Sequence, residues 1–185
     1  SALSNKITIL HYLPQKSQQE ISQECILIGK KFGLPKSLEK NVTSADSSRR
    51  LKVGFLSDGF RRHPVGMMTT GALEELSKFD FDLYFYSTTY ARDHLTERMA
   101  KVAYKWKEIH QLSNLQTADT IRSDGIDILI DLSGHNTGSR MRAVAEHPAP
   151  IVAKWVGGLI NTTGVAAVDY LITDQVETPV GVDSD

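Results

Sequence analysis

The chain has 185 residues, of which 41% are hydrophobic and 23% charged, and its formal net charge is −1. This composition is typical of a soluble globular protein. The charge argues against a protein that mainly binds nucleic-acid phosphates, which requires an excess of Lys and Arg. A single cysteine, Cys25, cannot form an internal disulfide. No apolar run approaches the roughly 20 residues that span a bilayer. We therefore expect a cytoplasmic protein without membrane or nucleic-acid partners.

Residues 1–50 are predicted to hold a helical connector segment and a linker. Within residues 16–33, apolar side chains recur at helical spacing between Lys, Gln and Glu, which predicts one amphipathic helix that ends near Gly33. Residues 36–50 show no hydrophobic period and are rich in Ser and charged side chains. That composition is typical of a linker.

From residue 51 onward, apolar segments alternate with helical patterns. The predicted strands are 51–57, 81–88, 107–112, 126–133, 151–156 and 168–173. The predicted helices between them are 65–79, 93–104, 114–124 and 138–146. Nearly apolar strands that alternate with helices indicate a parallel sheet covered on both faces. The expected fold class is therefore α/β, with a doubly wound sheet over residues 51–185.

In such a sheet, ligands bind beyond the carboxyl ends of the strands, where helix N-termini favour anions. The first strand is followed by "SDGFRRHPVG", in which Pro64 suits the first turn of a helix and His63 stands at its mouth. The competing interpretation is a solvated turn of Arg61, Arg62 and His63. The stretch contains neither G-x-G-x-x-G nor a P-loop, so a standard nucleotide signature is absent.

Two further loops follow strands. Gly134 and Gly138 bracket His135, Asn136 and Thr137, which suits an anionic or sugar-like ligand before a helix. The alternative is a plain connection whose glycines only satisfy positive φ.

The other loop is "GGLINTTG", residues 157–164. It is a small-residue, hydroxyl-rich loop that lets backbone approach a substrate closely, or else a plain long connection. The remaining histidines are scattered and cysteines are not paired, so no metal site is expected.

The three loops together resemble one family. "LKVGFLSDGFRRHPVG", "DGIDILIDLSGHNTGSR" with "HPAPIVAKWVG", and "TGVAAVDYLITDQVETP" are similar to the amino-terminal lobe of the catalytic region of O-linked N-acetylglucosamine transferases, including bacterial homologues and SPINDLY-type relatives. The resemblance covers about residues 51–182. The N-terminal "SNKITILHYLP" is similar to the segment that joins tetratricopeptide repeats to this region.

The resemblance implies a fold and a chemistry. The fold is one Rossmann-like lobe of a GT-B glycosyltransferase. The reaction is transfer of a sugar, most simply N-acetylglucosamine from UDP-GlcNAc, to Ser or Thr of a protein or peptide acceptor, with no cofactor and no metal. Such transfer needs donors aimed at the departing phosphate and a group that receives a proton.

The resemblance also implies site residues. His63 is the expected active-site histidine, and His135 and Asn136 fall where the family has a cleft-lining pair. The loop that carries the remaining expected donor-site residues matches a Gly- and Thr-rich loop near sugar and acceptor; those residues are Gly157, Gly158, Thr162, Thr163 and Gly164.

This chain departs from the family pattern at two places. The family's loop usually has Tyr-Pro after its first Gly, and this chain has "GGLINTTG". A second cleft histidine of animal members would fall near 104–106, where none stands. We expect the second GT-B lobe after Asp185 and tetratricopeptide repeats upstream, and we expect residues 1–185 alone to be inactive or nearly so.

Two other classes of function compete with this one. A non-catalytic protein-interaction module would not bring the loops at 58–64, 134–138 and 157–164 to one cleft. A self-contained nucleotide- or sugar-phosphate-binding enzyme would need a complete site within the chain, and the missing phosphate fingerprint counts against it.

Overall fold

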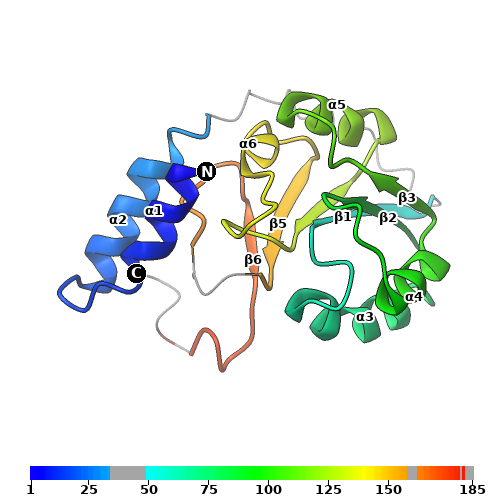
Figure 1. The fold of residues 1–185 in the computed structure, drawn as a ribbon, viewed down its shortest axis with the longest axis horizontal. Coiled ribbons are helices and arrows are strands. Elements are labelled where there is room, and N and C mark those ends of the chain that lie inside the picture. The colour runs from blue at the N-terminus through cyan, green and yellow to red at the C-terminus, as the bar shows by residue number, and fades with distance from the viewer. Residues whose placement is uncertain (34–48, 158–161, 180, 182–185) are drawn as a thin grey trace.

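A computed structural model describes residues 1–33, 49–157, 162–179 and 181. Six parallel strands form one sheet in the order β3-β2-β1-β4-β5-β6, the order of a Rossmann sheet (Figure 1). The strands are β1 (Leu51–Ser57), β2 (Phe81–Ser87), β3 (Lys105–Glu108), β4 (Ile128–Asp131), β5 (Ile151–Trp155) and β6 (Tyr170–Ile172). The helices are α1 (Ala2–Leu10), α2 (Gln18–Gly29), α3 (Pro64–Leu76), α4 (His94–Val102), α5 (Asn114–Asp124) and α6 (Met141–Val144).

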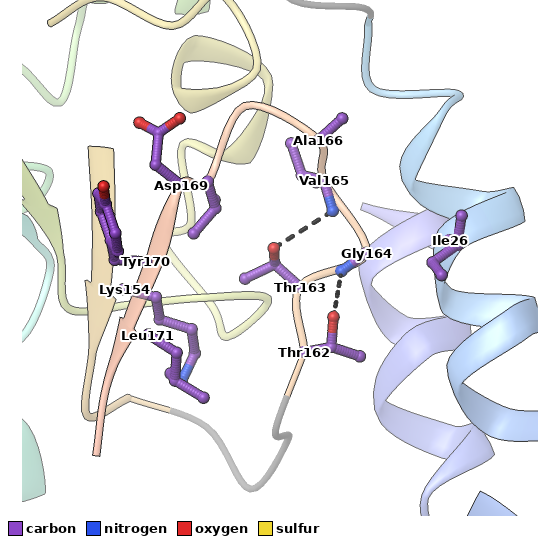
Figure 2. Close-up of a pocket in the computed structure, with 11 residues that line it drawn as sticks. Ile26, Lys154, Thr162, Thr163, Gly164, Val165, Ala166, Asp169, Tyr170 and Leu171 are labelled. Atoms are coloured by element: carbon purple, nitrogen blue, oxygen red, sulfur yellow. Dashed lines mark hydrogen bonds between the residues drawn. The ribbon is translucent and has the colours of Figure 1, made fainter. Parts of the chain in front are cut away.

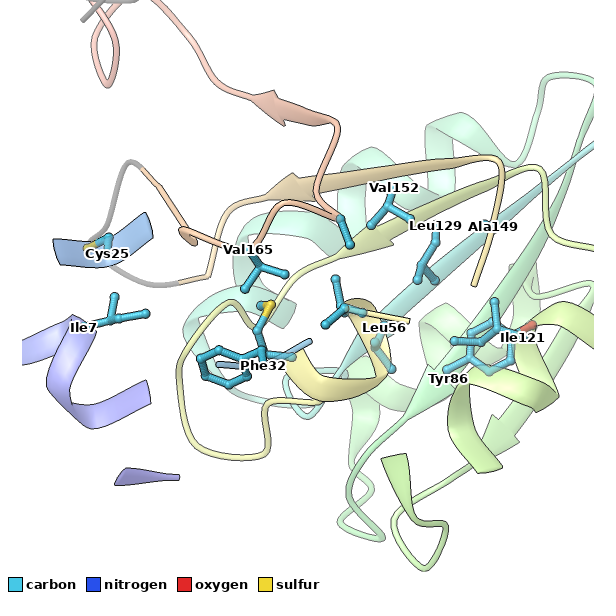
Figure 3. Close-up of a cluster of buried hydrophobic side chains, with 14 of the residues drawn as sticks. Ile7, Cys25, Phe32, Leu56, Tyr86, Ile121, Leu129, Ala149, Val152 and Val165 are labelled. Carbon is cyan, nitrogen blue, oxygen red and sulfur yellow. The ribbon is translucent and has the colours of Figure 1, made fainter. Parts of the chain in front are cut away.

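Alternate residues of the central strands enter two separate cores, one on each face of the sheet. On one face, Val53 and Phe55 of β1 pack with α3 and α4 residues such as Leu73 and Met99. On the other face, Leu56 belongs to a cluster shared with the remaining helices. Figure 3 shows this second cluster, which runs from Ile7 and Cys25 of the N-terminal helices to Ile121 of α5. Both faces of the sheet are thus covered, which is why its strands read as continuous apolar runs.

The predicted α/β class and doubly wound sheet are confirmed. The predicted helix at 16–33 is α2, which begins with a capping box formed by Ser17 and Glu20. The third strand was predicted too late in the chain: it lies at Lys105–Glu108, on the sheet edge, where Lys and Glu side chains replace the apolar run that marks an inner strand.

Helix α1 lies where the sequence pattern predicted no element. Ser1 caps it by accepting a hydrogen bond from the backbone N–H of Ser4, and Ile7 and Leu10 enter the same core as the sheet. Most of the predicted linker at 36–50 lies outside the described residues, and the domain boundary at residue 50 stays a prediction.

Candidate functional site

The strand order reverses between β1 and β4, and the loops that leave their carboxyl ends diverge there, which is the usual ligand position in such sheets. A cavity of about 610 Å³ opens at this edge, and we call it the switch-point cavity. The loops after β1, β4 and β5 all contribute to its wall, through Asp58, His63, Asn136, Thr137, Val156 and Gly157. The structure therefore brings together three of the predicted site residues: His63, Asn136 and Gly157.

His63 is half-buried and is the N-cap residue of α3. Its Nδ1 accepts a hydrogen bond of 3.3 Å from the backbone N–H of Val65, and Pro64 occupies the first helical position. A neutral imidazole whose Nδ1 accepts carries its proton on Nε2. The second ring nitrogen is therefore a donor, which suits a phosphate or carbonyl oxygen of a ligand.

Asp58 also lies on the wall of the switch-point cavity, and the sequence analysis did not single it out. Its carboxylate is 13% exposed, with Arg61 Nη2 3.8 Å from Oδ2 and Ser133 Oγ 3.4 Å from Oδ1. Gly138 has a φ of +78°, and a Cβ there would lie 2.6 Å from Asp58 Cβ, so only glycine leaves room for this side chain. The sequence feature that could have indicated Asp58 is its position directly after the first strand.

His135, which was expected to line the cleft, is not among the residues that line the switch-point cavity. Its side chain is 3% exposed, and Nε2 lies 2.8 Å from the carbonyl oxygen of Thr163. Its Nδ1 lies 3.3 Å from Ser4 Oγ, and its ring packs on Phe32 at 5.2 Å. Burial lowers the pKa of this imidazole. His135 therefore joins the N-terminal helices to the loop after β5, because both ring nitrogens already face protein oxygens.

Thr162, Thr163 and Gly164 line a second cavity, of about 310 Å³, between that loop, β6 and Ile26 of α2. Figure 2 shows the hydroxyl groups of the two threonines turned back to the chain, where Thr162 Oγ1 accepts from Gly164 N and Thr163 Oγ1 from Val165 N. These hydroxyls therefore shape the loop. Gly158 lies outside the described residues.

Two buried charged side chains stand at paired positions of β4 and β5, and one of them, Lys154, lines the second cavity. Asp131 is fully buried, and burial raises its pKa to about 6 against the opposing effect of the hydrogen bonds from Gly134 and Ser133. Lys154 is 2% exposed, and burial lowers its pKa. The Asp131 carboxylate and the Lys154 ammonium group are thus neighbours, and both are poorly solvated.

Among residues 1–33, 49–157, 162–179 and 181, no three His, Cys, Asp or Glu side chains are grouped so that they could hold a metal ion. The helices in these same ranges are too short or too polar to cross a membrane.

Comparison with known sequences identifies relatives along nearly the whole chain. The model of the family described as Glycosyl transferase family 41 matches residues 17–185. A rice protein named "Probable UDP-N-acetylglucosamine--peptide N-acetylglucosaminyltransferase SPINDLY" is 28% identical over 97% of this chain. A protein of the same name from Eustoma exaltatum subsp. russellianum is 36% identical over 73% of the chain. The chain spans about a fifth of the length of the rice relative and 15% of the Eustoma one.

The fold also matches a solved structure. A mutant of the Thermobaculum terrenum O-GlcNAc transferase superposes with a TM-score of 0.81 at 30% sequence identity. The match covers 94% of this chain and 34% of that one. The predicted lobe of a GT-B glycosyltransferase is confirmed as the fold.

Proposed function

This chain belongs to glycosyl transferase family 41, and on that premise we propose that it forms one lobe of a protein O-glycosyltransferase. The donor is UDP-GlcNAc and the acceptor is a Ser or Thr hydroxyl of a protein or peptide. The names of the relatives support the donor and the peptide acceptor.

One observation carries the proposal. The loops after β1, β4 and β5 converge on a single cavity at the point where the strand order reverses. A non-catalytic interaction module would not require His63, Asn136 and Gly157 to meet there. The convergence therefore favours an enzyme site over a surface used only for docking.

The cavity wall offers the groups that the transfer needs. The acceptor oxygen attacks the anomeric carbon, the bond from that carbon to the phosphate oxygen breaks, and UDP leaves with the electron pair. The Nε2–H of His63 and the N-terminus of α3 suit the negative charge that develops on the phosphate. The Asp58 carboxylate is our candidate for the group that receives the hydroxyl proton.

We further propose that the rest of the site lies in a second lobe and that tetratricopeptide repeats lie upstream. The chain spans only 34% of the solved transferase that it matches. Residues 1–185 alone would then be inactive or nearly so, since contacts to the nucleotide would be missing.

The test is sugar transfer by the full-length protein that contains this chain. Labelled UDP-GlcNAc and GDP-fucose are supplied in parallel with a Ser/Thr-rich peptide, with and without EDTA. We expect transfer from UDP-GlcNAc, unchanged by EDTA because no metal takes part.

His63→Ala should lower the rate of transfer about 100-fold or more, whereas His94→Ala, at an exposed histidine outside the cavity, should not. Absence of transfer from either donor would refute the proposal, and transfer from GDP-fucose alone would refute the donor assignment.

A further inference from the structure

Two buried side chains of opposite charge stand at paired positions where β4 and β5 end. Asp131 is 0% exposed and Lys154 is 2% exposed. The two residues are partners in the parallel register of the strands, so their side chains lie on the same face of the sheet. A lysine is almost never buried to this extent without a specific partner.

Each of the two side chains forms hydrogen bonds with the backbone of the loop that follows its own strand. Asp131 Oδ2 accepts from Gly134 N at 2.7 Å, and Oδ1 accepts from Ser133 N at 3.3 Å. Lys154 Nζ donates to the carbonyl oxygen of Val156 at 3.1 Å. Figure 2 shows the long Lys154 side chain among the residues that line the second cavity. The aspartate thus fixes the loop after β4, and the lysine fixes the loop after β5.

The bend held by Lys154 is unfavourable for its own sequence. Val156 has a φ of +46°, a left-handed conformation that is a clear outlier for a β-branched residue. Such a residue keeps this conformation only when its surroundings impose it. Gly157 follows with a φ of +67°, and a Cβ there would lie 1.9 Å from the carbonyl oxygen of Leu132.

The loops after β4 and β5 lie against each other next to the Lys154 side chain. A Cβ placed on Gly134 would lie 2.9 Å from the carbonyl oxygen of Gly157 and 3.2 Å from Lys154 Cε. The loop after β4 also supplies Asn136 and Thr137 to the switch-point cavity, and the loop after β5 supplies Val156 and Gly157. A shift of the Lys154 side chain would therefore move the residues that form this wall of the cavity.

We propose that Lys154 is a positioning residue whose buried ammonium group, beside Asp131, holds the strained Val156–Gly157 bend in place as a wall of the switch-point cavity. Core packing alone does not account for a lysine here, since burying a charge is costly and a well-packed apolar residue of similar volume is often at least as stable. An apolar residue cannot donate to the Val156 carbonyl group. The conformational role stands by itself, and its effect on sugar transfer rests on the proposed function.

The experiment is hydrogen exchange by mass spectrometry on the full-length protein, with Lys154→Met as the variant. We expect amide exchange across 132–137 and 155–157 to rise about tenfold or more, while exchange in β1 and β2 stays unchanged. Lys105→Met is the matched control, because Lys105 of β3 is 47% exposed and forms an ion pair with Asp124 of α5. Unchanged exchange in the two loops of Lys154→Met would overturn the proposal.

A second substitution tests the strain itself. Val156→Gly places at the bend a residue that adopts positive φ without a steric penalty. We expect Val156→Gly to restore near-wild-type exchange protection in the Lys154→Met background. If Lys154→Met alone does not fold, the double variant should fold. A double variant that stays as unprotected as Lys154→Met, or that also fails to fold, would contradict the assigned role.

Sugar transfer by the same proteins separates this inference from the proposed function. Lys154→Met should lower the transfer rate about tenfold or more, with recovery in the double variant. Loosened loops in Lys154→Met, together with no sugar transfer by the wild-type protein, would refute the proposed function and leave the positioning role intact. Loosened loops with an unchanged transfer rate would refute only the effect of the bend on transfer.

Discussion

At the scale of single residues, the proposed hydrogen-bond donor and the proposed proton acceptor are two different side chains of the switch-point cavity. The Val65 N–H occupies Nδ1 of His63, so the neutral ring presents a donor to the cavity. A proton acceptor must then come from another side chain. Asp58 and Glu177 are the carboxylates on the described wall of the cavity, and Asp58 is the more enclosed of the two.

We expect Asp58→Asn to lower kcat for sugar transfer by about 100-fold and to change KM little, because the amide keeps the shape of the carboxylate but cannot accept the proton. The measurement is steady-state kinetics of the full-length protein. Glu177→Gln is the matched control, since Glu177 lines the same cavity but is exposed. An equal loss of kcat in both variants, or no loss in Asp58→Asn, would show that Asp58 does not receive the hydroxyl proton.

At the scale of elements, α1 and α2 are joined to the sheet by shared core and by a polar contact. Ile7 of α1 and Cys25 and Ile28 of α2 belong to the same buried cluster as Leu56 and Val152 of the sheet. His135 adds a contact from the loop after β4 to Ser4 of α1. The first two helices thus support the loops that form the cavity.

We expect Ile7→Ala to lower the free energy of unfolding by about 2 to 5 kcal/mol, because Ile7 is 0% exposed and its loss leaves a cavity in the core. Chemical denaturation measures this change. Ile9→Ala is the control on the same helix, since Ile9 is 58% exposed, and it should change stability by less than about 0.5 kcal/mol. Similar values for the two variants would mean that α1 does not dock as described.

At the scale of the whole molecule, the sheet buries charge as well as apolar surface. Asp131 lies at the carboxyl end of β4 with a pKa raised to about 6 by burial, whereas an unfolded aspartate titrates near ~3.9. The folded state therefore binds this proton more tightly than the unfolded state. By linkage, the stability that Asp131 contributes is fully present below its unfolded pKa and is lost as pH rises through about 6.

We expect the free energy of unfolding at about pH 5 to exceed that at about pH 7.5 by roughly 1 kcal/mol more in the wild-type protein than in Asp131→Asn. The comparison with the variant removes the contributions of other groups, among them His135, whose lowered pKa acts in the opposite direction. Denaturation curves across this pH range provide the measurement. Parallel pH profiles of the two proteins would show that Asp131 does not take up a proton near pH 6.

The sequence by itself determined the α/β class and the parallel sheet, and it placed His63, Asn136 and Gly157 in loops that follow strands. Inner strands buried on both faces must be apolar throughout, and strand-end loops of such a sheet meet at one edge, so both features appear in the linear pattern.

Only the tertiary structure decided which polar residues face solvent and which face the core. His135 stands in a polar, glycine-flanked loop, yet α1 and the loop after β5 enclose it. Lys154 looks like an ordinary strand residue, and its role depends on Asp131 from another strand and on the bend at Val156. These contacts join residues far apart in the chain, and the physical reason is that burial and hydrogen bonding depend on which segments the fold brings together.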